Sequence, residues 1–74
     1  MRERKPATDA AKAGEVDLVR RSLEGVIDNN TRDQAALDSA RALARRHLRK
    51  HAIEIAKTIT SNQMRDRALS ELAQ

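Results

Sequence analysis

The sequence predicts an all-α fold, a small bundle or a short solenoid-like stack of three to five helices. Helix-favouring Ala, Leu, Arg, Glu and Gln dominate the chain. Apolar residues recur at steps of three or four, and no segment alternates as a strand does. Residues that start and stop helices separate these apolar patterns. A chain of 74 residues has room for one such domain.

The chain begins with charged residues up to Pro6 and lacks the apolar stretch of a secretory signal. We expect residues 1–7 to form a disordered basic head and residues 8–74 to form a single helical domain. Thr8 is the expected N-cap of a short helix over residues 9–13, and Gly14 should end that helix.

The next expected helix covers residues 16–28. Asn29 and Asn30 should end it, because Asn tolerates a positive φ better than most residues. Its apolar face is predicted to contain Leu18, Val19, Ser22, Leu23, Val26 and Ile27.

Two capping boxes are predicted, in which Thr31 pairs with Gln34 and Thr60 pairs with Gln63. An apolar seam between them permits one helix over residues 32–59, which would be long for so small a domain. We therefore expect a break near residues 49–51. The seam consists of Leu37, Ala40, Ala44, Leu48, Ala52, Ile55 and Ile59. The last helix, over residues 61–73, should present Met64, Ala68, Leu69 and Leu72 on one face.

Residues 9–23 resemble the helix pair of an ankyrin repeat, with matches at Ala10, Ala11, Gly14, Leu18, Val19 and Leu23. The Thr-Pro-Leu-His opening of that family is missing, Ser22 replaces a Leu, and the closing glycine is displaced to Gly25. Residues 52–73 are similar to helical hairpins of tetratricopeptide-like solenoids. These resemblances imply a helix pair joined by a tight glycine turn, and scaffolds that bind partners and do not catalyse reactions.

The core predicted from composition is small, because only 39% of residues are hydrophobic and none is aromatic. Either the helices pack closely through alanines, or the module gains burial by docking or by forming a homodimer. The chain has no cysteine, which excludes disulfides and cysteine-bound zinc. It also has no apolar run able to span a membrane, so we expect a cytoplasmic location.

Five basic residues lie between Asp38 and Glu54 with no acidic residue among them: Arg41, Arg45, Arg46, Arg49 and Lys50. On one helix, the last four would cover an arc of about 140°, with Arg41 near the edge of the apolar seam. This face either binds an anionic partner or is a solvated surface whose long side chains cover apolar neighbours. Arg45, Arg46, Arg49 and Lys50 are expected to be exposed.

No catalytic apparatus is visible, because the chain lacks a glycine-rich phosphate loop and a nucleophile elbow. His47 and His51 have the spacing of a metal-binding pair with Glu54 as third ligand, but the neighbouring cations disfavour a metal ion. Asp33 and Asp38 are interpreted as surface residues that complement a helix dipole. We therefore expect no enzyme activity, no cofactor and no metal.

The function that the sequence favours is a non-catalytic protein–protein interaction module, an adaptor, regulator or inhibitor. Its helical surface with a basic face would contact an acidic protein partner. The alternative is a small nucleic-acid-binding regulator that uses the basic helix 41–50. Missing aromatic residues argue against RNA stacking, and the segment has no Asn or Gln to read DNA bases.

Overall fold

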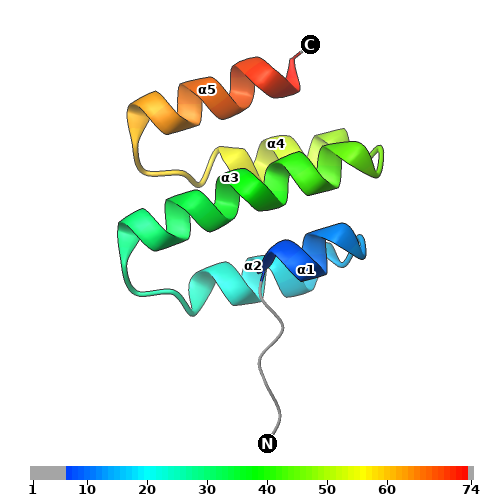
Figure 1. The fold of residues 1–74 in the computed structure, drawn as a ribbon, viewed down its shortest axis with the longest axis horizontal. Coiled ribbons are helices and arrows are strands. Elements are labelled where there is room, and N and C mark those ends of the chain that lie inside the picture. The colour runs from blue at the N-terminus through cyan, green and yellow to red at the C-terminus, as the bar shows by residue number, and fades with distance from the viewer. Residues whose placement is uncertain (1–6, 74) are drawn as a thin grey trace, which may run out of the picture.

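The computed structural model describes residues 7–73, and that range folds into five α-helices with no strand (Figure 1). The all-α prediction is therefore confirmed. The helices are α1 (Ala7–Lys12), α2 (Val16–Glu24), α3 (Asn29–Arg45), α4 (Arg49–Ala56) and α5 (Asn62–Leu72). No helix in the described range is long and apolar enough to cross a membrane.

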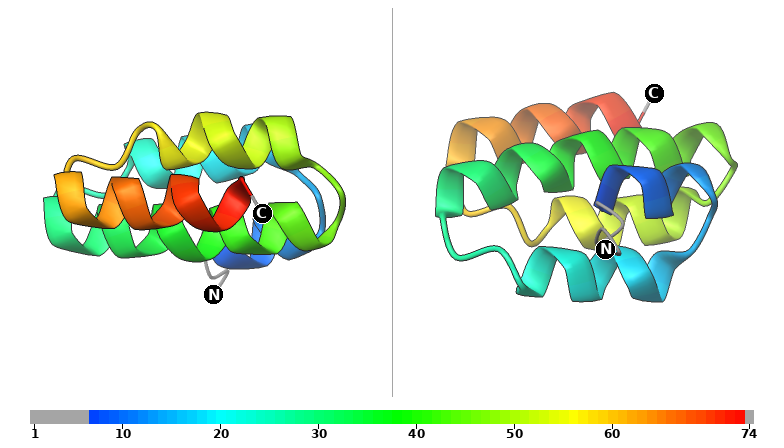
Figure 2. Two further views of the ribbon diagram at one scale, coloured as in Figure 1. Left: turned by 90° about the horizontal axis from the view of Figure 1, so that it is seen from above. Right: turned by 60° about the horizontal axis from the view of Figure 1, so that its bottom comes forward.

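The five helices form a flat two-layer stack of about 40 × 26 × 13 Å. Figure 2 shows α1, α3 and α5 in one layer and α2 and α4 in the other. Successive helices run in opposite directions, so α1 pairs with α2 and α3 pairs with α4. Helix α3 is the centre of the stack, because it contacts each of the other four helices.

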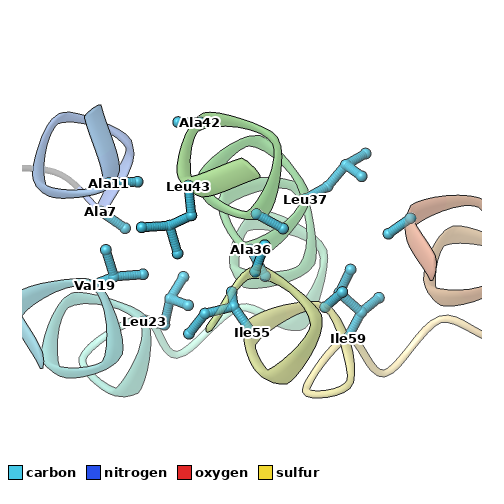
Figure 3. Close-up of a cluster of buried hydrophobic side chains, with 14 of the residues drawn as sticks. Ala7, Ala11, Val19, Leu23, Ala36, Leu37, Ala42, Leu43, Ile55 and Ile59 are labelled. Atoms are coloured by element: carbon cyan, nitrogen blue, oxygen red, sulfur yellow. The ribbon is translucent and has the colours of Figure 1, made fainter. Parts of the chain in front are cut away.

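The core follows α3 through both layers and is built largely from small residues. Leu43 lies beside Val19 and Ala7, and Ile59 lies on the side of α5 (Figure 3). Alanine allows the helix backbones to approach closely, which compensates in part for the missing aromatic residues. The buried hydrophobic residues are Ala7, Ala10, Ala11, Val19, Leu23, Ala36, Leu37, Ala40, Ala42, Leu43, Ala52, Ile55, Ala56, Ile59, Ala68 and Leu72.

Helix α1 ends at Lys12, and the predicted Gly14 closes it in a left-handed conformation with φ 77°. The Gly14 amide donates to the Ala11 carbonyl, and the Glu15 amide donates to the Ala10 carbonyl, as in a Schellman motif. The start was predicted less well. Helix α1 begins at Ala7, so Thr8 lies inside the helix and is not its N-cap. Ala7 itself is buried. The remainder of the expected basic head lies outside the described residues.

Helix α2 ends at Glu24, four residues before the predicted end, because Gly25 closes it. Asp28 is extended and already belongs to the start of α3. Only part of the predicted apolar face is buried: Val19 and Leu23 enter the core, whereas Leu18 is 36% exposed and Ile27 is 96% exposed. Asn29 and Asn30, the predicted stop, are instead the first two residues of α3.

The N-caps predicted for the two capping boxes, Thr31 and Thr60, are also wrong. Asp28 caps α3, and its Oδ2 accepts hydrogen bonds from the Thr31 amide and hydroxyl, each at 2.8 Å. Ser61 caps α5 and accepts from the Met64 amide at 3.3 Å. Thr60 lies one residue too early to cap α5. Asp28 and Ser61 are both extended, and each lies three residues before the amide from which it accepts. This is the usual N-cap geometry, so each is a better local acceptor than the predicted threonine.

The seam over residues 32–59 is interrupted, as predicted, although the break comes slightly earlier than expected, between Arg45 and Arg49. His47 has φ 65° at this turn. Its amide donates to the Ala44 carbonyl, and the Leu48 amide donates to the Leu43 carbonyl. This is a second Schellman motif, with a histidine at the position where glycine is most common.

The predicted apolar face of the last helix is confirmed. Ala68 and Leu72 are buried, and Met64 and Leu69 are partly buried against the core.

Candidate functional site

The turn between α3 and α4 gathers basic side chains at one end of the stack. Arg45 is the last residue of α3, Arg46 is its C-cap, and Arg49 and Lys50 open α4. We call these four residues the basic end. All four are exposed, as predicted. The break in the helix therefore brings them together at a blunt end and does not spread them along one helix face.

The basic end lies next to the turn between α1 and α2, on the right of Figure 1. One guanidinium nitrogen of Arg46, Nη1, donates to the Lys12 carbonyl at 3.1 Å. A Cβ at Gly14 would lie 2.9 Å from Nε of Arg46, so glycine leaves room for this contact. The carbonyl acceptor is neutral. The hydrogen bond therefore positions Arg46 without cancelling its charge.

Two of the basic-end cations have no partner among residues 7–73. Neither Arg45 nor Lys50 makes a hydrogen bond or an ion pair with a described residue, whereas Arg49 is engaged in an interaction within the chain. The two acidic residues that bound the basic segment in sequence face other groups. Asp38 accepts from the Gln34 amide group, and Glu54 pairs with Arg20.

Arg41 is separated from the other predicted residues because Glu71 of α5 binds it. Nε and Nη2 of Arg41 each donate to one carboxylate oxygen of Glu71 at 2.9 Å. The hydrogen bond from Arg41 holds the pKa of the Glu71 carboxyl below its ordinary value, and Glu71 in turn raises the pKa of Arg41. Arg41 is therefore engaged in an ion pair within the chain. It lies one helical turn before Arg45.

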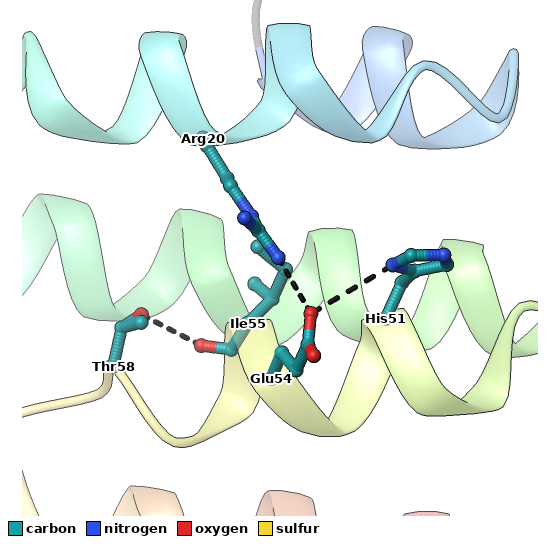
Figure 4. A network of polar contacts seen from close by, with 5 residues as sticks. All are labelled: Arg20, His51, Glu54, Ile55 and Thr58. Carbon is teal, nitrogen blue, oxygen red and sulfur yellow. Dashed lines mark hydrogen bonds and ion pairs between the residues drawn. The ribbon is translucent and has the colours of Figure 1, made fainter.

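The metal hypothesis loses its geometric basis. His47 lies in the turn with a positive φ and His51 lies on α4, so the two do not share one helix face. Nδ1 of His51 lies 3.7 Å from Oε1 of Glu54 (Figure 4). Among residues 7–73, no three His, Cys, Asp or Glu side chains gather as metal ligands.

Asp33 has a buried role that was not predicted from the sequence, where it was interpreted as a surface residue. Asp33 is 3% exposed and joins α3 to the segment before α5. Its carboxylate accepts from the Thr60 amide at 2.9 Å, the Thr60 hydroxyl at 2.7 Å and the Ser61 amide at 3.1 Å. The sequence did contain an indication of this burial. Asp33 lies four residues before Leu37, which places it on the same helix face as the apolar seam.

The charge state of Asp33 follows from these contacts. Burial by itself would raise the pKa of Asp33. The hydrogen bonds from Thr60 and Ser61, together with the positive charge of Arg32, outweigh burial and hold the pKa below its ordinary value. Asp33 is thus an ionised, internally satisfied carboxylate with a structural role.

A groove of about 470 Å³ separates α2 from α4. Arg20 of α2 and Glu54 of α4 meet across it, as Figure 4 shows. Leu23 and Ile55 lie beneath but are only 5% and 1% exposed. The groove therefore presents charged side chains of both signs along its walls.

Comparisons of the chain with protein-family models, with curated proteins and with solved structures found no match.

Proposed function

We propose that the protein is a non-catalytic interaction module, an adaptor, regulator or inhibitor, that binds an acidic surface of a partner protein. The observation that carries this proposal is the basic end. Arg45 and Lys50 are exposed and have no partner among the described residues, and Arg46 bonds a neutral carbonyl. Uncompensated cations gathered on a rigid support favour association with a surface of opposite charge.

The surrounding scaffold supports a binding role. Short antiparallel helix pairs stacked in two layers are the arrangement that the resemblance to ankyrin and tetratricopeptide-like repeats implies. Such stacks hold their turns at fixed positions, so a cluster of charges at one turn keeps its geometry before a partner arrives. Less conformational entropy is then lost on binding.

An acidic protein is a better partner for this end than nucleic acid. The alternative function depended on a continuous basic helix over residues 41–50, which could lie in a DNA groove. The chain divides that segment at the turn between Arg45 and Arg49, and Glu71 binds Arg41. The remaining cations form a compact cluster that matches a small acidic patch more closely than a long phosphate backbone.

The test begins with a pull-down from the native host, followed by charge reversal. The double variant R45E/K50E should lose at least tenfold in affinity for the captured partner and keep its helicity. The control is R21E/K57E, which changes net charge equally at two exposed residues away from the basic end. Equal affinity of the two double variants would mean that the basic end is a solvated surface.

Salt dependence separates the two classes of partner. Phosphate binding through several contacts weakens steeply between low and physiological salt, because counterions are released. A protein contact anchored by two or three cations should weaken much less. Tight retention on nonspecific DNA that is lost steeply with salt would favour the nucleic-acid alternative.

A further inference from the structure

Helix α5 buries few apolar side chains for its length. Its fully buried residues are Ala68 and Leu72, and Met64 and Leu69 are only partly buried. The largest side chains with almost no exposure, Leu43, Ile55, Ile59 and Val19, all precede α5. Elements with few buried apolar contacts open at the lowest free energy, so α5 should open more readily than α3 and α4.

Polar contacts compensate for the thin apolar contact at both ends of α5. At its start, the buried carboxylate of Asp33 holds Thr60 and Ser61 through three hydrogen bonds. Near its end, Glu71 forms the two-bond ion pair with Arg41. The side chains of this pair are 39% and 41% exposed, so water and ions reach it.

The ion pair links α5 to the basic end. Arg41 and Arg45 lie four residues apart on α3, which places them about 6 Å apart along one side of the helix. An acidic group seated at Arg45 therefore reaches the neighbourhood of Arg41, where it meets the negative charge of Glu71. Docked α5 thus both occupies Arg41 and places a carboxylate beside the basic end.

We infer that α5 is an autoinhibitory element of the basic end. It detaches when the Arg41–Glu71 pair and the bonds of Thr60 and Ser61 to Asp33 break, and its release adds Arg41 to the cations available to an acidic partner. A partner that binds the released state more tightly shifts the population toward it. This inference rests on the proposed function of the basic end, and the experiment separates the two.

The first measurement is native-state hydrogen exchange of the full chain by NMR, which needs no partner. Amides of α5 should exchange through an opening at least tenfold more populated than the openings of α3 and α4. The variant T60V keeps the side-chain shape but removes one bond to Asp33, and should raise α5 exchange about fivefold with little change in α3. Equal protection of α5 and α3 would refute a separately opening helix.

The second measurement is the affinity for a fluorescent decaglutamate peptide at low salt. The variant E71Q removes the negative charge that competes for Arg41, and D66N removes the same charge from an exposed residue of the same helix that has no partner among the described residues. E71Q should bind the peptide about two- to fivefold more tightly than D66N, as expected for loss of a partly exposed competing pair.

The peptide affinities of wild type, E71Q and D66N show whether the autoinhibition or the proposed function has failed. If wild type binds the peptide through Arg45 and Lys50 but E71Q and D66N bind equally, autoinhibition is refuted and the proposed function stands. If no variant binds the peptide, both proposals are refuted, and the exchange data still report whether α5 opens by itself.

Discussion

Replacing Asp33 tests a buried polar contact between two segments that are far apart in the sequence. Asp33 is 3% exposed, and its carboxylate accepts three hydrogen bonds from Thr60 and Ser61. A hydrogen bond to a charged group contributes about 1.5–3 kcal/mol, but Thr60 and Ser61 are exposed enough for water to replace part of the loss. We therefore expect D33A to lower the free energy of unfolding by about 2–4 kcal/mol.

This loss is large for a small domain. A stability of about 0.05–0.15 kcal/mol per residue corresponds to roughly 4–11 kcal/mol for the whole chain. Urea denaturation followed by circular dichroism at 222 nm should show a clear fall in the midpoint for D33A. The variant D38A is the control, because Asp38 lies on the same helix and accepts one side-chain hydrogen bond, from Gln34.

The outcome that would refute this reasoning is a D33A cost below about 1 kcal/mol and equal to that of D38A. The contacts of Asp33 would then be replaced by water at no net cost. A double-mutant cycle with T60V isolates the contribution of the Thr60 hydroxyl, and a coupling energy near zero would contradict the bond at 2.7 Å.

Asp33, His47, Ser39 and the small core each give one further testable expectation. Because the folded pKa of Asp33 is lowered, its stabilisation should be complete above the ordinary value of 3.8 and be lost as pH falls through the folded pKa; the stability difference between wild type and D33N, measured by denaturation from pH 6 to pH 2, should shrink accordingly. H47G should raise stability by about 0.5–1 kcal/mol, because φ 65° strains any side chain, and a lower melting temperature would contradict this. S39A should stabilise by about 1 kcal/mol in urea, because the Ser39 hydroxyl is fully buried and bonds no group in the described residues; an unchanged midpoint would refute it. The thin core predicts a homodimer through the last two helices, and sedimentation as an 8.3 kDa monomer at micromolar concentration would defeat that prediction.

The local features that were predicted correctly are governed by short-range physics. Helical composition and the spacing of apolar residues are enough to specify helices, and Gly14 ends α1 because a left-handed residue is required there. The exposure of Arg45, Arg46, Arg49 and Lys50 also follows locally, since unpaired cations are costly to bury. The break in the long seam was expected from length alone, but its position depended on His47 adopting a conformation that glycine usually takes.

Tertiary structure decided which of several similar residues forms a given contact. Thr60 is a plausible cap by sequence, yet it donates to a carboxylate 27 residues earlier. By contrast, the caps that Asp28 and Ser61 provide are local contacts. Arg41 and Arg45 are alike in sequence, but only Arg41 meets a carboxylate, because the stack places α5 beside α3. The sequence by itself therefore determined the helices and their charged surface, since these depend on neighbours within a turn or two. The composition of the basic end, and the buried role of Asp33, depend on which distant segments the stack brings into contact.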